Sequence, residues 1–135
     1  MYEFEVEGNI TGKQRPRVNR YTGNIYTPNA TKDYEEYIRQ CFFLKYPKNV
    51  MLEGRVEVEI EAYLKIPANT KKVDKENMIN NFISPVKKPD IDNIAKVVLD
   101  SINSYVIKDD SQVTKISVEK KYAETPKLVI RIKEY

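Results

Sequence analysis

Apolar and polar residues alternate along four stretches of the chain, a pattern that predicts β-strands with one buried face. The clearest stretch is 55–66, in which every second residue is apolar. Weaker alternation predicts further strands over 2–7, about 113–122 and 127–133. The segment Ala123–Pro126, which lies between the last two strands, is expected to form a hairpin turn.

Apolar residues recur every three or four positions in two other stretches, which predicts two main helices. The first begins near Thr27-Pro28, a capping residue followed by proline, and runs to about Lys45. The second covers about 91–103. The residues expected to face the core are Tyr34, Tyr37, Ile38, Cys41 and Phe42 in the first helix, Ile91, Ile94, Ala95, Val98 and Ile102 in the second, and Ile116, Val118 and Tyr122 in the strand that follows it.

These elements follow the order strand, helix, strand, helix, strand, strand, which predicts an α+β fold. We expect a two-layer sandwich in which the two main helices cover one face of a four-stranded mixed sheet. A length of 135 residues suits a single domain spanning 1–135. Residues 8–27 are expected to form a loop or an irregular ribbon, and 67–89 a long connection with a short helix near 73–82. Connections as long as 67–89 are usually functional or mobile.

Two features of the composition narrow the chemistry. The chain has no histidine, which excludes Ser-His-Asp and Cys-His nucleophile systems and histidine-ligated zinc. Its single cysteine, Cys41, cannot form an internal disulfide and is expected to be a small buried apolar residue. Carboxylates, lysines and tyrosines remain as candidates for catalysis. Carboxylates without histidine favour hard cations with oxygen ligands, such as Mg²⁺ or Mn²⁺.

Charge is unevenly distributed along the chain, although the net charge is only +3. The run 12–20 contains four cations and no acid, and 67–89 contains five lysines against two acids. Basic runs beside an acidic cluster suit a protein that processes a phosphodiester backbone, and a solvated loop surface is the alternative. The candidates for DNA contact are Lys13, Arg15, Arg17, Arg20, Lys71, Lys72, Lys87 and Lys88, and Tyr21 and Tyr26 are candidates for base stacking or, alternatively, for the core.

The acidic cluster begins at the start of the second predicted helix. Asp90 stands at its N-cap position, and Asp92 and Lys96 share a stripe beside the core-facing stripe. Each has an ordinary alternative, because Asp90 and Asp92 can cap the helix and Lys96 can pair with Asp92. Asp109 and Asp110 follow the helix, where a turn that starts a strand is the alternative.

The length of the second helix decides whether these acids can meet. The helix is about 18 Å long, and the segment that leads from it to Asp110 spans about 23 Å when nearly extended. The chain can therefore just return along the helix and bring Asp109 or Asp110 beside Asp90 and Asp92. A site that is completed across a dimer interface stays open as the other possibility.

Together these stretches resemble the RusA family of Holliday junction resolvases. The family pattern is K-P-D-x-D-N-x-x-K, then D-[AS]-[LI]-N, then D-D-x-Q-[VI], and this chain matches it over Lys87–Asn103 and Asp109–Val113. The segments Gly12–Val18, Tyr26–Pro28 and Tyr34-Glu35 also look like those of phage-type members. The resemblance covers most of the chain.

The resemblance implies a homodimeric, Mg²⁺-dependent endonuclease, in which Mn²⁺ can substitute and no nucleotide cofactor is needed. Such an enzyme would bind four-way DNA junctions and nick two opposed strands. Carried over by position, the metal-binding catalytic carboxylates are Asp90, Asp92 and Asp110, with Asp109 as a further candidate ligand, and Lys96 matches the family's essential lysine. The candidate dimer contacts are the strand edges and any exposed members of Tyr34, Tyr37, Phe42 and Phe43.

Two other functions remain as alternatives. One is a nuclease of broader specificity that cuts flaps or other branches, and a panel of DNA substrates separates it from a junction resolvase. The other is a non-catalytic protein that binds or scaffolds branched DNA, against which the intact set of carboxylates and Lys96 argues. The chain has no apolar run of about 18 residues and no leader-like N-terminus, so we expect no membrane partner and a cytoplasmic location.

Overall fold

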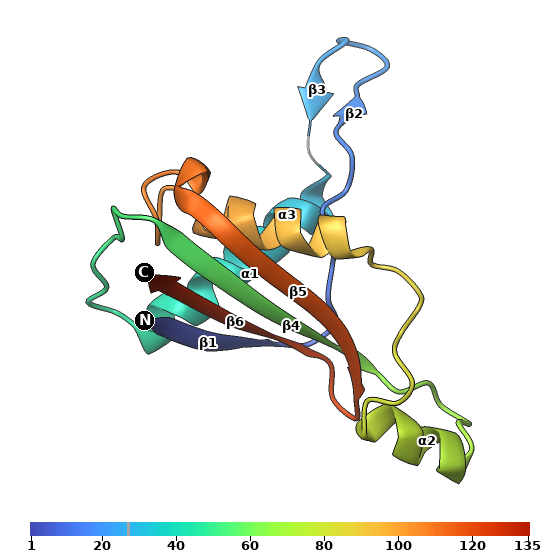
Figure 1. The fold of residues 1–135 in the computed structure, drawn as a ribbon. Coiled ribbons are helices and arrows are strands. Elements are labelled where there is room, and N and C mark those ends of the chain that lie inside the picture. Colours follow the sequence, from blue (N-terminus) through green and yellow to red (C-terminus); the bar gives the residue numbers. More distant parts are fainter. Residues whose placement is uncertain (27) are drawn as a thin grey trace.

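The computed structural model describes residues 1–26 and 28–135, and its centre is a four-stranded mixed sheet (Figure 1). The strand order is β1-β6-β4-β5, in which β4 and β5 are parallel and the other neighbours are antiparallel. The predicted α+β fold is confirmed. The strands are β1 (Tyr2–Glu7), β4 (Val56–Lys65), β5 (Val113–Ala123) and β6 (Lys127–Glu134).

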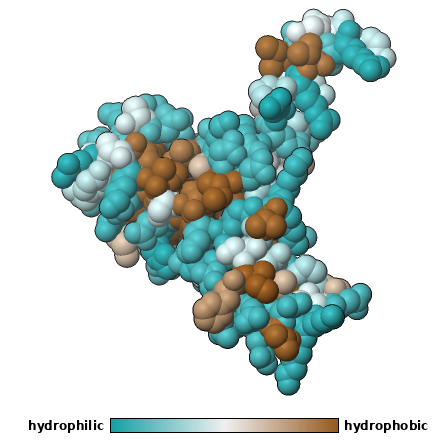
Figure 2. Space-filling view, turned by 45° about the vertical axis from the view of Figure 1, so that its right-hand side comes forward, coloured by the Kyte–Doolittle hydropathy of each residue, from teal (hydrophilic) through white to brown (hydrophobic). Residues whose placement is uncertain are grey.

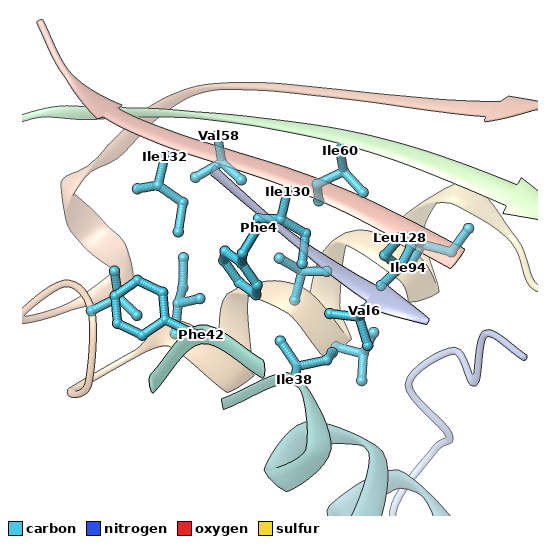
Figure 3. Packing of buried hydrophobic residues seen from close by; sticks show 14 of the residues in the cluster. Phe4, Val6, Ile38, Phe42, Val58, Ile60, Ile94, Leu128, Ile130 and Ile132 are labelled. Atoms are coloured by element: carbon cyan, nitrogen blue, oxygen red, sulfur yellow. The ribbon is translucent and has the colours of Figure 1, made fainter. Parts of the chain in front are cut away.

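Two helices, α1 (Asn29–Lys45) and α3 (Ile91–Ile102), pack against each other and cover one face of this sheet (Figures 1 and 3). The shorter α2 (Lys72–Ile79) lies at one end of the sheet, and the 3₁₀ turn η1 (Asp110–Gln112) leads into β5. Pro28 occupies the N-cap position of α1 rather than its first helical position. The predicted cap Thr27 lies outside the described residues.

The core forms where the alternating face of β4 meets the apolar stripes of the helices (Figure 3). Val58 and Ile60 of β4 face Ile94 of α3, and all three are at least 98% buried. Phe4 of β1 meets Phe42 of α1 edge to face, with ring centroids 5.4 Å apart. Burial of a large apolar side chain stabilises the fold by about 1.5–3 kcal/mol, so this cluster fixes where α3, and with it the acidic motif, lies on the sheet.

The buried side of each helix differs from the predicted stripe. In α3, Val97 and Ser101 are buried while Ile91 is 49% exposed, because the helix packs against α1 as well as against the sheet. In α1, Tyr37 is exposed and Cys41 is only partly buried. The predictions for Ile91 and Tyr37 were therefore wrong, whereas Cys41 and the other apolar residues of both stripes contribute to the core or lie partly buried beside it.

The last two strands do not form the predicted hairpin. β5 and β6 are both neighbours of β4 and lie on opposite sides of it. Residues 124–126 cross the carboxyl end of β4, where the amide of Ile66 donates to the carbonyl oxygen of Ala123. β5 is thus an edge strand, and Ile116 on its helix-facing side is 41% exposed rather than part of the core.

Residues 14–26 form an arm that projects from the body of the molecule (Figure 1). It contains the two short antiparallel strands β2 (Arg17–Val18) and β3 (Ile25–Tyr26), which agrees with the irregular ribbon predicted there. None of the helices in the described part of the chain is long and apolar enough to span a membrane.

Candidate active site

A cleft of about 860 Å³ lies between the amino-terminal end of α3 and the segment 10–17 that leads into the arm. Asp90, Asp92 and Lys96 line this cleft together, as the sequence predicted for the start of the helix. The segment is fastened to α3 by a hydrogen bond from the backbone amide of Lys13 to the carbonyl oxygen of Asn93, 2.9 Å long. The cleft therefore has one wall built by the motif and one wall built by the base of the arm.

Gly12 makes this close approach possible. A Cβ atom at this position would lie 2.9 Å from the Cβ of Pro89 and 3.1 Å from the Cβ of Asn93. The first distance is too short for a carbon contact and the second is unusually tight, so a side chain at this position would push the segment away from the start of α3. Sequence reasoning treated Gly12 as part of a basic loop and did not identify this packing role.

Asp90 and Asp92 present exposed carboxylates at the amino end of α3. Asp90 is the N-cap residue by its backbone angles, but its side chain makes no capping hydrogen bond. Among the described residues, neither carboxylate has an ion-pair or side-chain hydrogen-bond partner. The positive end of the helix dipole favours negative charge here. Two carboxylates in this setting can accept a cation, and the capping alternative for Asp90 is not realised.

Lys96 lies one turn beyond Asp92 on the same side of α3 and is exposed. The alternative that it pairs with Asp92 is not realised either, since no ion pair joins them in the described structure. A free ammonium group beside two carboxylates suits a phosphate that approaches from the solvent side of the cleft.

Asp109 and Asp110 lie near the other end of α3. Just after the helix, the amide of Val106 donates to the carbonyl of Ile102, and Ile107 pairs with Leu52 in an isolated bridge. The side-chain amide of Gln112 then donates to the carbonyls of Leu52 and Gly54, which fixes η1 beside the start of β4.

After α3 the chain forms η1 at the far end of the helix before β5 runs back beside α3, so Asp109 and Asp110 lie apart from Asp90 and Asp92. The twelve residues of α3 separate them, a length of about 18 Å. No group of three or more Asp, Glu, His or Cys side chains in the described ranges is placed to hold a metal ion.

The two neighbouring aspartates in η1 have different surroundings. Asp109 caps the turn, because its Oδ2 accepts a hydrogen bond from the amide of Ser111 at 3.2 Å and its backbone amide donates to Oε1 of Gln112 at 2.8 Å. The hydrogen bonds from Ser111 lower the pKa of the Asp109 carboxyl below its usual value. Asp110 is exposed and makes no such bond.

Lys13 differs from the other predicted DNA-binding residues because its ammonium group already has partners. It lies 2.9 Å from Oε1 of Glu35 on α1 and 3.1 Å from Oδ2 of Asp100 on α3. Burial alone lowers the pKa of Lys13, but the hydrogen bonds to these two carboxylates outweigh it and raise that pKa. The partners lie far from Lys13 in the sequence, so no local pattern pointed to them.

The remaining predicted DNA-binding residues are all exposed but lie in three places. Arg15, Arg17 and Lys88 line the cleft. Arg20 lies on the arm, and Lys87 precedes the motif. Lys71 and Lys72 stand at the start of α2 and do not line the cleft.

Comparison with known proteins identifies the family of this chain. The family model described as endodeoxyribonuclease RusA matches residues 7–133. The chain belongs to the RusA family. It is 31% identical over 137 residues to the uncharacterized protein YqaN of Bacillus subtilis (strain 168), and the match spans 98% of this chain and 95% of YqaN. As a RusA-family member it is an endodeoxyribonuclease, and the family implies Holliday junction resolution and DNA binding.

Proposed function

We propose that this RusA-family chain is a Mg²⁺-dependent endonuclease that resolves four-way DNA junctions by paired nicks, using aspartates to hold the metal. The observation that carries the proposal is the grouping of Asp90, Asp92 and Lys96 in one cleft. Each is exposed, and none has an ion-pair partner among the residues described. Free carboxylates that face a polyanion repel it unless a cation lies between them, so a protein that only binds DNA gains nothing from them.

In this proposal the residues of the cleft have two roles, metal binding and DNA binding. Asp90 and Asp92 would hold Mg²⁺, which takes one or two carboxylates together with substrate phosphate oxygens. When bound, this ion supplies charge neutralisation at the phosphate and an activated water. Lys96 contacts the phosphate to be cleaved, and Arg15, Arg17 and Lys88 bind the DNA backbone on either side. Mn²⁺ can take the place of Mg²⁺ because it accepts the same oxygen ligands.

The metal site is completed, in this proposal, by Asp110 from a second copy of the chain. Within one chain Asp110 lies near the far end of α3, about 18 Å from the motif. A two-fold axis that sets two α3–β5 edges antiparallel brings the far end of one copy to the near end of the other. Each cleft then receives one Asp110, and the two nicks are made by two related sites. Asp109 serves as the cap of η1 rather than as a ligand.

The surface for this dimer is the open edge of β5. Tyr34 and Phe42, two of the earlier candidates, are at most 7% exposed and are taken up by the core. β5 is an edge strand with Ile116 exposed on its helix-facing side, and Leu99 and Val118 lie partly buried nearby. Figure 2 shows an apolar area in the middle of the molecule, surrounded by hydrophilic surface. Exposed edge strands with apolar neighbours favour pairing with another chain.

Cleavage of a labelled four-way junction and a matched linear duplex, with and without Mg²⁺, tests the activity. Wild type is expected to nick the junction in opposed strands only with Mg²⁺. Asp90→Asn should bind the junction without nicking it, and because asparagine also suits an N-cap, the variant should fold normally. Binding without cleavage by wild type would favour a scaffolding protein. Equal cutting of the linear duplex would favour a general nuclease.

A mixing experiment tests the shared site. Asp90→Asn and Asp110→Asn are each expected to be inactive, but a mixed dimer contains one cleft in which both aspartates are intact. Mixing the two variants should therefore restore single nicks on the junction. If each site is built within one chain, the mixture stays inactive, and the shared site is wrong while the nuclease activity stands.

A further inference from the structure

The tip of the arm holds one aromatic side chain in the solvent. Tyr21 is 96% exposed, although the turn that carries it is well ordered by hydrogen bonds. Oδ1 of Asn19 accepts from the amides of Tyr21 at 2.8 Å and of Thr22 at 3.1 Å, and the amide of Gly23 donates to the carbonyl of Asn19 at 2.9 Å. Gly23 has a φ of +74°, which glycine adopts without strain. The turn thus places Tyr21 at the tip of the arm, away from the body of the molecule.

The rest of the arm has the composition of a nucleic-acid contact. Between Gln14 and Tyr26 there are three arginines and no acid. Arg15, Arg17 and Arg20 form no ion pair within the described residues. Val18 and Ile25 pair across the ribbon and are 63% and 73% exposed, so the arm buries little of its own apolar surface. A two-stranded ribbon of this kind is marginally stable alone, which favours a partner that packs against it.

The arm and the cleft are continuous, which favours DNA as that partner. Arg15 and Arg17 line the cleft, and the ribbon leads from them to Tyr21. Arg15 and Tyr21 are six positions apart and the chain turns at 20–22, so the reach between them is at most about 20 Å, or about six nucleotides of one strand. DNA that lies in the cleft therefore passes along the arm toward its tip.

We infer that Tyr21 stacks on a base exposed at the branch point of a DNA junction and thereby makes the protein prefer branched over linear DNA. This rests on the proposed function, since it names how the same site selects its substrate. In a linear duplex the base faces are covered by their neighbours, so Tyr21 has nothing to stack on. At a branch the stacking is interrupted, and an aromatic ring contributes affinity whatever the base sequence.

Equilibrium binding without metal tests the inference, using a four-way junction and a linear duplex of equal length. Tyr21→Ala is expected to lose about tenfold in junction affinity, the range found for removal of one aromatic stacking partner, and to keep its duplex affinity. Tyr21→Phe should retain the junction preference, since the ring remains. Arg20→Ala is the matched control on the same tip and should weaken both DNAs alike, with a smaller dependence on salt.

Two further measurements locate the contact. A junction with 5-iodouracil at the branch should crosslink to the peptide that contains Tyr21 when irradiated. Sedimentation should show the same oligomeric state for wild type and Tyr21→Ala. A shift of that state would overturn the inference, because it would place Tyr21 against a second copy of the chain.

The outcomes separate this inference from the proposed function. If wild type nicks junctions with Mg²⁺ and Tyr21→Ala keeps the full junction preference, the stacking role is wrong and the nuclease stands. If Tyr21→Ala loses the preference for the junction but wild type never nicks it, the stacking role is supported and the proposed junction cleavage is wrong. If Tyr21→Ala weakens binding to both DNAs equally, Tyr21 is a general contact and the inference is overturned.

Discussion

Lys13 and Asp100 fasten the base of the arm to α3 through an ion pair of 3.1 Å between Nζ and Oδ2. Glu35 of α1 completes the contact from the other side, at 2.9 Å. One side chain therefore joins the segment that forms a wall of the cleft to both main helices. We therefore propose that Lys13 positions this wall of the cleft, and we expect its replacement to have consequences that differ from those of Arg15 or Arg17.

Lys13→Met is expected to lower the free energy of unfolding by about 1–3 kcal/mol, because Glu35 keeps a partly buried charge without its partner. Urea denaturation measures this change. Lys32→Met is the matched control, since Lys32 is exposed on α1 without an ion pair in the described structure, and it should change stability by less than about 0.5 kcal/mol. An equal loss in both variants would mean that the network does not stabilise the fold.

The same contact predicts a pH dependence. The pKa of Lys13 is raised in the folded protein, so its contribution to stability is complete below the ordinary lysine pKa of 10.5 and is lost as the pH rises through the folded value. Wild type should therefore lose its stability advantage over Lys13→Met only above that pH. Urea titrations at pH 8 and pH 11, about two and a half units below and half a unit above the ordinary value, measure the difference. A constant difference would contradict the assignment.

Gly12→Ala is expected to separate the base of the arm from α3. Its Cβ would meet Pro89 at 2.9 Å, and such overpacking costs about 1–3 kcal/mol. Junction nicking should fall at least about tenfold, because misplacement of a substrate-positioning wall reduces rates strongly. Gly54→Ala is the control, because its nearest neighbour would be 3.7 Å away, an ordinary contact. Full activity in Gly12→Ala would show that this wall does not position the DNA.

Asp109 and Asp110 should respond differently to the same change. Asp109→Asn keeps a good capping side chain for η1, so nicking should stay within a few-fold of wild type. Asp110→Asn removes a proposed metal ligand and should abolish nicking while leaving the melting temperature unchanged. Single-turnover cleavage and thermal denaturation measure the pair. The reverse order of effects would make Asp109 the ligand.

Tyr34→Phe is expected to leave the fold intact and raise the free energy of unfolding by about 1 kcal/mol. The Tyr34 hydroxyl is buried and has no hydrogen-bond partner among the residues described. Burial also raises the pKa of this hydroxyl. Because the folded pKa is the higher one, wild type should lose stability relative to Tyr34→Phe as the pH rises above the ordinary value of 10.0. A substantial loss of stability in Tyr34→Phe would instead reveal a partner for the hydroxyl.

The local sequence pattern was sufficient to predict the main strands and helices. It also placed the part of the candidate site that lies on α3. The alternation in β4 and the spacing in α1 and α3 depend on neighbours a few positions apart, and so does the grouping of Asp90, Asp92 and Lys96 on one helix. These features were predicted because the helix itself places the residues.

Long-range relationships were not contained in local pattern. Nothing near Ala123 indicates that β4 lies between β5 and β6, and the hairpin prediction failed for that reason. The position of Asp110 depends on how Gln112 binds Leu52 and Gly54, about sixty residues earlier in the chain. The chain after α3 is long enough to bring Asp110 back to Asp90. The hydrogen bonds of Gln112 instead hold η1 beside the start of β4, at the far end of α3.

The place of β6 between β1 and β4 determines when the sheet can form during synthesis of the chain. Within the part of the chain that the structure describes, β1 pairs only with β6, and β6 is also the antiparallel partner of β4. β1 therefore has no partner in the sheet until residues 127–134 have been made. Pairings between such distant segments form slowly, so a chain that is still being synthesised cannot yet assemble the body that holds its cleft. The sheet is completed only after residues 127–134 have been synthesised and are free to pair with β1 and β4.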